Sequence, residues 1–221
     1  MSNNLKVIAI FATSLDGRLG PADATRFVRI SSDADMEHLL RVRDLADAVI
    51  MGGTTFKHYP KPHRGLMRND LPLHSIITSG KSLTFNEPLF HATPPVPVVI
   101  FSPNSHTREL PPDVDWEKIS ALEQANGDGI NAILENLGRR GINTLLVEGG
   151  GEIFRQFLLA KAVDELYLTL VPTFIGGDKS PRLTGFGAEF PTPSPRTRML
   201  NTWQIGDERY FHLALDYDTT N

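Results

Sequence analysis

Residues 145–152 of this chain read LLVEGGGE, an apolar run followed directly by three glycines and an acidic residue. The run predicts a buried strand, and the residues after the glycines favour a helix. Glycines let a backbone approach a phosphate closely, and a helix N-terminus presents unpaired N–H groups to an anion. A tight strand-to-helix turn without any ligand explains the same pattern. On this stretch alone both interpretations stay open, because the spacing is not the dinucleotide fingerprint G-x-G-x-x-G.

Two further junctions have the same form. Residues 49–56 read VIMGGTTF and residues 76–80 read IITSG, so each apolar run again ends in glycine and hydroxyl side chains. The hydroxyls of Thr54 and Thr55 are suited to bind phosphate oxygens, but capping of a helix explains them equally simply. In open α/β sheets, ligands bind outside the carboxyl ends of the strands. Several glycine-marked strand ends in one chain therefore favour a ligand site.

Strands and helices alternate along the chain. We expect strands at residues 5–12, 48–51, 74–78, 97–101, 143–147 and 165–171. Helices are expected at residues 34–46 after the cap Asp33, from the cap Asp128 to Arg140, and at residues 152–160. Residues 199–205 and 209–215 predict a closing hairpin around Gly206-Asp207. The alternation indicates an α/β fold, and the hairpin indicates an antiparallel edge on a mixed sheet.

Composition narrows the function classes. The chain has 221 residues and a formal net charge of −4, which does not favour a nucleic-acid partner. It contains no cysteine, which excludes disulfides, thiolate metal sites and a cysteine nucleophile. No apolar run reaches the roughly 18 residues of a membrane helix, and the N-terminus does not resemble a signal peptide. The seven histidines show no metal-binding spacing. We therefore expect one cytoplasmic domain over residues 1–221, with neither metal nor membrane partner.

A few charged residues are candidates for chemistry. Asp16 precedes a glycine, where a turn explains it; the functional interpretation makes it an anchor or proton-handling group in a cleft. Glu148 either faces solvent or lines a closed pocket, where desolvation would raise its pKa and make it a candidate acid. Four loop arginines are candidates to meet a phosphate, although a solvated surface is the plainer interpretation for each: Arg26, Arg29, Arg64 and Arg68.

Three segments, in this order, resemble the reductase domain of the bifunctional riboflavin-biosynthesis deaminase–reductase. They are residues 14–19 (SLDGRL), residues 46–55 (ADAVIMGGTT), and the series LVEGG at 146–150, VDEL at 163–166 and PTFIGG at 172–177. The resemblance runs from about Leu5 to Leu215. It implies a dihydrofolate reductase-like fold, with a central mixed, mostly parallel sheet, helices on both faces and a C-terminal antiparallel hairpin. It also implies a homodimer, with the deaminase activity supplied by another chain.

The resemblance further implies NADPH as the hydride donor and a ribosylaminopyrimidine 5′-phosphate as the substrate, whose ribose is reduced at C1′. The residues that it assigns to the cofactor are Ala12, Thr13, Gly52, Gly53, Thr54, Thr55, Ser79, Gly149, Gly150, Gly151 and Glu152. Those that it assigns to the substrate are Ser14, Asp16, Arg18 and Arg29, and Asp16 and Glu148 are the catalytic candidates.

The chain departs from the family pattern in the loops that would face the substrate. Arg18 stands where the family often has lysine, residues 27–30 read FVRI where it often has Trp-Ile, and residues 58–62 read HYPKP where Asp-Asn-Pro is usual. These departures leave two alternatives to the riboflavin-pathway reductase. One is a related NADPH reductase that acts on a pteridine or dihydrofolate. The other is a non-catalytic nucleotide-binding module that kept only the fold.

Overall fold

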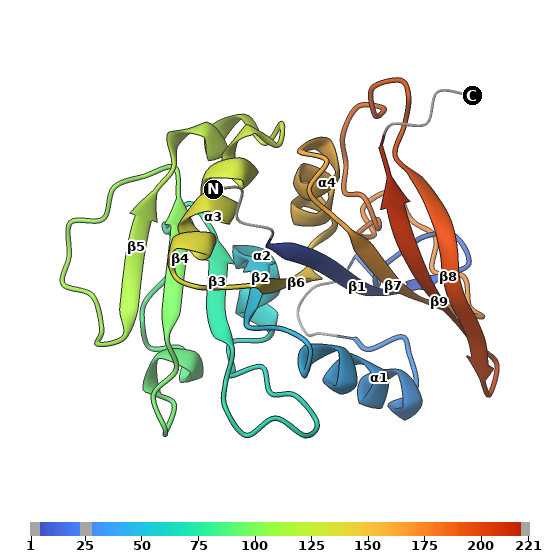
Figure 1. The fold of residues 1–221 in the computed structure, drawn as a ribbon, viewed down its shortest axis with the longest axis horizontal. Coiled ribbons are helices and arrows are strands. Elements are labelled where there is room, and N and C mark those ends of the chain that lie inside the picture. The colour runs from blue at the N-terminus through green and yellow to red at the C-terminus, as the bar shows by residue number, and fades with distance from the viewer. Residues whose placement is uncertain (1–4, 23–27, 218–221) are drawn as a thin grey trace.

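The computed structural model describes residues 5–22 and 28–217, and its strands form one nine-stranded sheet (Figure 1). The strands are β1 (Lys6–Ser14), β2 (Ala48–Gly52), β3 (Leu73–Ile77), β4 (Val98–Ser102), β5 (Val114–Lys118), β6 (Thr144–Gly149), β7 (Glu165–Val171), β8 (Arg196–Ile205) and β9 (Glu208–Asp216). The helices are α1 (Asp33–Arg43), α2 (Gly53–His58), α3 (Asp128–Arg139) and α4 (Gly151–Leu159), with short 3-10 helices at Pro88–His91 and Ser120–Gln124.

The sheet is mixed and mostly parallel, as expected. Its order is β5-β4-β3-β2-β6-β1-β7-β9-β8, and only the two pairs that involve β9 are antiparallel. Every residue of β2 is buried, because strands of a parallel sheet are covered on both faces. The predicted hairpin is confirmed, with Gly206 at φ +58° in its turn.

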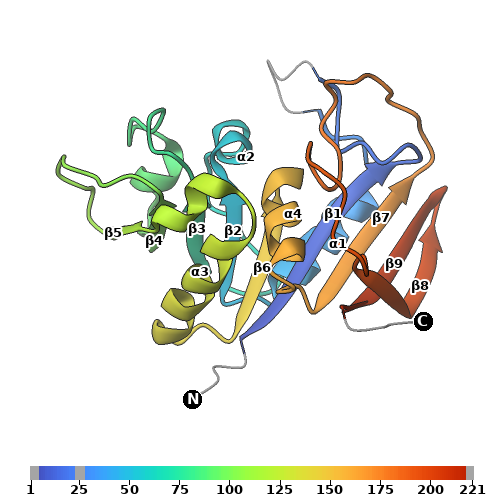
Figure 2. The ribbon, with the colours of Figure 1, turned by 90° about the horizontal axis from the view of Figure 1, so that it is seen from above.

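Helices cover both faces of the sheet and enclose two apolar cores. Buried side chains of α3 and α4 belong to one core, and those of α1 and α2 belong to the other. Successive residues of β1 contribute to opposite cores, with Phe11 in the first and Ile10 in the second. Figures 1 and 2 show α3 and α4 on one face and α1 on the other. None of the helices within the described ranges is long and apolar enough to cross a membrane.

Several expected boundaries need correction. Asp33 is not the cap of α1: the Ser32 hydroxyl accepts the hydrogen bond of the Asp35 N–H, at 3.3 Å, and Asp33 is the first helical residue. Gly127, not Asp128, precedes α3. Helix α1 ends at Arg43 rather than at residue 46, and Leu45, just beyond its end, is 54% exposed. Strand β5 was not expected, because its sequence VDWEK has little apolar character.

The chain reverses its direction of travel across the sheet between β2 and β6. These two strands are neighbours, but β2 leads through α2 to β3 on one side, whereas β6 leads through α4 towards β7 on the other. Such a switch point is where open α/β sheets bind ligands. The β2–β6 register also shifts there, since Ile50 pairs with Val147 and Met51 pairs with Gly149. Glu148 is therefore the extra residue of a bulge beside the switch point.

Candidate active site

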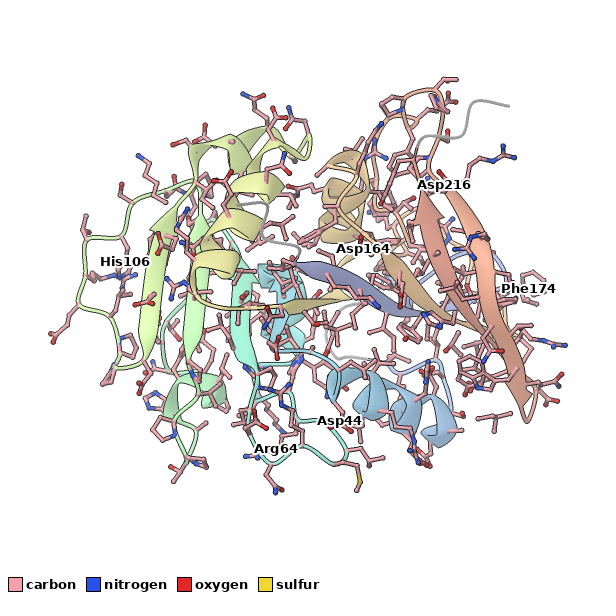
Figure 3. The ribbon with its side chains drawn as sticks, in the orientation of Figure 1. Asp44, Arg64, His106, Asp164, Phe174 and Asp216 are labelled. Carbon is pink, nitrogen blue, oxygen red and sulfur yellow. The ribbon has the colours of Figure 1, made fainter. Side chains whose placement is uncertain are left out.

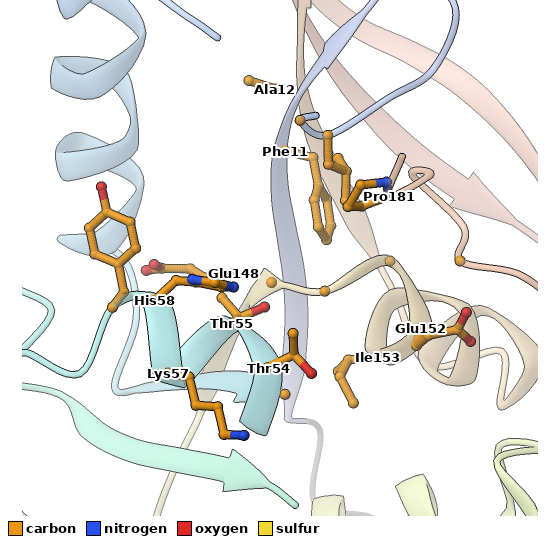
Figure 4. Close-up of a pocket in the computed structure, with 18 of the residues that line it drawn as sticks. Phe11, Ala12, Thr54, Thr55, Lys57, His58, Glu148, Glu152, Ile153 and Pro181 are labelled. Atoms are coloured by element: carbon orange, nitrogen blue, oxygen red, sulfur yellow. The ribbon is translucent and has the colours of Figure 1, made fainter. Parts of the chain in front are cut away.

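A cavity of about 730 Å³ opens at the carboxyl ends of β1, β2, β3 and β6 (Figure 4). This volume lies within the range of small-molecule sites. Its floor is formed by the two glycine junctions, and Figure 4 shows Thr54 and Thr55 from α2 opposite Ile153 and Glu152 from α4. One wall comes from α1 and the segment before it, and another comes from residues 181–186. The cavity thus occupies the switch point that the sheet order defines.

The two glycine junctions pack directly against each other. A Cβ atom at Gly149 would lie 2.6 Å from Cγ2 of Thr55, and one at Gly52 would lie 2.9 Å from Cγ1 of Ile153. Gly150 has φ +80°, which side-chain-bearing residues rarely adopt. Glycine at these positions lets the α2 and α4 junctions meet with bare backbone towards the cavity.

Most of the residues assigned to the cofactor line this cavity. They are Ala12, Gly52, Gly53, Thr54, Thr55, Ser79, Gly149, Gly150, Gly151 and Glu152, and the catalytic candidate Glu148 and the substrate candidate Arg29 join them. Four assigned residues do not line it: Thr13, Ser14, Asp16 and Arg18. Thr13 and Ser14 are buried, at 3% and 0% exposure.

Glu148 is a buried carboxylate beside an arginine and a histidine. Its side chain is 5% exposed, and its two oxygens accept hydrogen bonds from Nε and Nη2 of Arg43 at 2.7 and 2.8 Å. Nδ1 of His63 lies 2.9 Å from Oε2. Burial alone would raise the pKa of Glu148, but His63 and Arg43 hold it well below its usual range. The expectation of a raised pKa is therefore wrong, and Glu148 is ionised at neutral pH.

A second histidine continues this cluster. The His63 N–H donates to Nε2 of His74 at 2.8 Å, and Nδ1 of His74 lies 2.9 Å from the Pro72 carbonyl oxygen. A carbonyl can only accept, so Nδ1 carries the proton and Nε2 is the acceptor. Burial and the neighbouring His63 lower the pKa of His74 to about 3. His74 is therefore a neutral, hydrogen-bonded part of the core.

Asp16 holds two loops together beside the cavity. Its carboxylate accepts hydrogen bonds from the Ser14 hydroxyl at 2.6 Å and from the backbone N–H groups of Ile175 and Gly176 at 3.1 and 2.8 Å. These donors lower the pKa of Asp16 to about 2. The local interpretation of Asp16 as a turn residue is thus extended by a long-range contact to the loop after β7.

The long loop between β7 and β8 supplies cavity residues that sequence reasoning missed. Arg182 and Phe186 line the cavity, with the Arg182 guanidinium over the Phe186 ring at 5.0 Å. The Phe186 N–H donates to the Glu152 carboxylate, which fastens the loop to the start of α4. Lys57 and His58, at the end of α2, also line the cavity. No motif marks Arg182 or Phe186, because only the folded loop brings them to the glycine junctions.

The remaining loop arginines have different places. Arg29 lines the cavity and pairs with Asp33, whereas Arg64 is exposed in the loop near the end of α1 (Figure 3). Arg68 pairs with Asp70 and Asp47, so a surface role describes it. Arg26 lies outside the described residues. Within residues 5–22 and 28–217, no group of histidines and carboxylates is arranged to hold a metal ion.

Solved structures define the class to which this architecture belongs. Dihydrofolate reductase from Enterococcus faecalis, in complex with NADP(H) and RAB-propyl, matches 96% of this chain and 97% of its own with a TM-score of 0.52 and 13% identity. Acinetobacter baumannii RibD matches more closely, with a TM-score of 0.78 and 21% identity over 98% of this chain. This chain spans 59% of that RibD chain. The fold is therefore dihydrofolate reductase-like.

The sequence comparison identifies the family within this class. The RibD C-terminal domain matches residues 5–210, and the chain belongs to that family. A relative from Archaeoglobus fulgidus, named 2,5-diamino-6-ribosylamino-4(3H)-pyrimidinone 5′-phosphate reductase, is 28% identical over 185 residues, which cover 77% of this chain and 81% of that protein. The resemblance drawn from the three sequence segments is confirmed.

Proposed function

We propose that this protein is an NADPH-dependent reductase that converts the ribosyl group of a ribosylaminopyrimidine 5′-phosphate to the ribityl form in riboflavin biosynthesis. The observation that carries the proposal is the meeting of two glycine junctions at the β2–β6 switch point, in a chain whose relative is named as such a reductase. NADPH supplies the hydride when bound, and the protein supplies orientation and electrostatics.

The residues at the junctions fit a dinucleotide. Bare backbone at Gly149 and Gly150, followed by the N-terminus of α4, suits a pyrophosphate, because N–H groups at a helix start attract anions. The hydroxyls of Thr54 and Thr55 face the same space and suit the phosphates or the adenosine ribose. Ser79 at the end of β3 is assigned to the adenosine side. The nicotinamide would then lie near Ala12.

Lys57 supports NADPH over NADH. It lines the cavity, as do Ser79 and Ser82, and the described residues include no ion pair or hydrogen bond to its ammonium. A free cation in a cavity that also presents hydroxyls matches the chemistry of a 2′-phosphate. Lys57→Gln is expected to weaken NADPH affinity about tenfold, roughly 1.4 kcal/mol, and to leave NADH affinity unchanged.

The measurement is a fluorescence titration of each cofactor against each variant. Lys81→Gln is the control, because Lys81 is exposed in the neighbouring turn but does not line the cavity. Equal losses of NADPH and NADH affinity in the Lys57 variant would refute its assignment to the 2′-phosphate.

The charged side chains of the cavity suit the opening and reduction of the substrate's ribosyl group. Glu148 is an ionised carboxylate, so we assign it to the positive charge that develops when the ribosylamine opens to an iminium at C1′. It holds no proton to donate at neutral pH. His58 lines the cavity, and because imidazole is the side chain most often used for proton transfer in active sites, it is our candidate to protonate the ring oxygen. Arg29 is assigned to the substrate phosphate. Asp16, Ser14 and Arg18 would act by holding the loops around the substrate.

The state of the working enzyme is also a proposal. We infer a single reductase domain over residues 1–221 that works as a cytoplasmic homodimer. The exposed strand β8 supports the dimer, because an outer strand with unpaired backbone groups is suited to pair with a second copy.

The test is NADPH oxidation by the purified protein, with the substrate generated in the same tube by a separate deaminase. Oxidation that depends on the deaminase product supports the proposal. Oxidation with dihydrofolate or a pteridine instead would favour the related reductase. NADPH binding without turnover on any of these compounds would favour a binding module. Absence of NADPH binding would contradict the proposed function.

A further inference from the structure

Helix α1 forms a cavity wall although it is weakly embedded in the core. Asp35, Met36 and Leu39 of this helix line the cavity, and so does the segment 28–31 before it. Only Val42 among its eleven residues is fully buried. Apolar packing therefore contributes little to holding α1 against the sheet, and the position of the helix depends on other contacts.

A buried carboxylate holds the N-terminal end of α1. Glu208, at the start of β9, is 6% exposed. Its Oε1 accepts the Ser32 N–H at 2.7 Å, and its Oε2 accepts the Ser32 hydroxyl at 2.6 Å and the Tyr210 hydroxyl at 2.8 Å. Ser32 is the N-cap of α1 and directly follows the cavity-lining segment 28–31. Glu208 thus connects the terminal hairpin to the first turn of the wall.

A second buried carboxylate holds the other end. Arg43, the last residue of α1, makes a bidentate hydrogen-bonded contact with Glu148 of β6. Between the two ends, His38 packs edge-on against Trp203 and Tyr210 of the hairpin, with ring centroids 5.2 and 5.4 Å away. The helix is therefore fastened to the sheet at both termini by polar contacts with largely buried carboxylates.

We infer that Glu208 is a positioning residue for the substrate, because it fixes the α1 wall through Ser32. The inference rests on the proposed function for the identity of the substrate, but not for the fastening itself. Glu208 lies outside the cavity lining, so it acts through Ser32 and not by contact with a ligand. Among the described residues, the hydrogen bonds of Glu208 go to Ser32 and Tyr210, and none goes to the glycine junctions that would hold the cofactor. The substrate and the cofactor should therefore respond differently to its loss.

Glu208→Gln is the test variant. The amide has the same shape, but its NH₂ group cannot accept from Ser32 or Tyr210, so one oxygen's set of hydrogen bonds is lost. We expect faster amide hydrogen exchange in residues 28–40 and unchanged exchange in residues 149–158. We expect the KM for the pyrimidine substrate to rise about tenfold, with kcat changed less than twofold and NADPH affinity unchanged.

Glu165→Gln is the matched control. Glu165 on β7 also has two partners, Lys6 and His212, but touches neither α1 nor the cavity. Should Glu208→Gln fail to fold, Ser32→Ala keeps Glu208 but removes the hydroxyl, and with it both the bond to Glu208 and the cap bond from the Asp35 N–H. Ser32→Thr restores a hydroxyl and should restore the KM.

The outcomes distinguish the fastening of the α1 wall by Glu208 from the effect of that wall on the substrate. Unchanged exchange in residues 28–40 of the Glu208 variant overturns the fastening, whatever the wild type catalyses. Faster exchange there with an unchanged KM overturns the link to the substrate. If the wild-type protein reduces no ribosylaminopyrimidine phosphate, the proposed function fails, and the exchange experiment still decides whether Glu208 fixes the wall.

Discussion

Glu148 shows how one buried charge depends on its neighbours. Its carboxylate is matched by the Arg43 guanidinium and by His63, and all three side chains are at most 12% exposed. A buried pair of this kind contributes little net stability, but removing one partner leaves the other charge uncompensated. Arg43 and His63 lie 105 and 85 residues from Glu148 in the sequence. No local pattern therefore reveals that this carboxylate is ionised.

Glu148→Gln is expected to destabilise the protein by about 3–5 kcal/mol, because Arg43 would stay buried without its counter-charge. Turnover should fall as well, whereas NADPH affinity should stay near that of the wild type. Urea unfolding measures the first effect. The double variant Arg43→Met with Glu148→Gln should recover most of the lost stability. A single variant as stable as the wild type would rule out this ion pair as a structural element.

His74 makes stability depend on pH. Its pKa is about 3 in the folded protein and near 6.5 when unfolded, so between these values the unfolded chain binds the extra proton. Stability should therefore fall as pH drops below 6.5, by up to about 1.4 kcal/mol per pH unit from this one group. Urea unfolding at pH 7, 6 and 5 measures it. His74→Gln should remove this part of the slope, so the stability gap between wild type and variant should narrow on acidification. A constant gap would contradict the account.

Among the secondary-structure elements, the strand-to-helix turns position the site more than the helices themselves do. The β2–α2 and β6–α4 turns meet at the switch point, and the loop after β7 covers the start of α4. The alternating apolar runs were sufficient to predict these strands and the glycine-marked ends. The same runs did not predict that Lys57, His58, Arg182 and Phe186 line the cavity. A local pattern does not show which side chains the folded chain places over the end of a strand. The boundary errors at Asp33 and Asp128 arose because a neighbouring residue made the cap or preceded the helix.

Gly150→Val is expected to weaken NADPH affinity by more than tenfold. A Cβ atom there lies 3.3 Å from Oγ1 of Thr55, so the larger valine branches would crowd both junctions, and φ +80° adds backbone strain. Gly141→Val is the control: Gly141 has φ +81° after α3, but a Cβ atom there meets nothing within 4 Å. It should lose stability without losing cofactor affinity. Equal affinity losses in both variants would assign the effect to general strain.

Asp16→Asn tests the loop contact. The amide can accept only through one oxygen, so at least one of the bonds to Ile175 and Gly176 should be lost and the loop after β7 should loosen. Turnover should drop several-fold while NADPH affinity stays unchanged, as measured by initial rates and cofactor titration. Asp178→Asn in the same exposed loop is the control, and it should behave as wild type. Wild-type turnover in the Asp16 variant would show that this anchor is dispensable.

At the scale of the whole molecule, the two edges of the nine-stranded sheet have different roles. The β5–β3 side completes the cavity through residues at and just after the end of β3, and the β9–β8 hairpin contacts the α1 wall through Glu208. The order and spacing of short motifs predicted this fold over nearly its full length, because these motifs lie at the ends of strands. The substrate is harder to predict, since the loops that the resemblance assigns to it are those in which this chain departs from its family.

The most direct test of the central claim follows the hydride itself. The purified protein is supplied with NADPH carrying deuterium at the transferable nicotinamide position and with the ribosylaminopyrimidine phosphate from a separate deaminase, and the product is analysed by mass spectrometry and NMR. We predict a ribityl product with one deuterium at C1′, formed at the rate of NADPH oxidation. Substrate-dependent oxidation with no deuterium at C1′, or no ribityl product at all, would contradict the account.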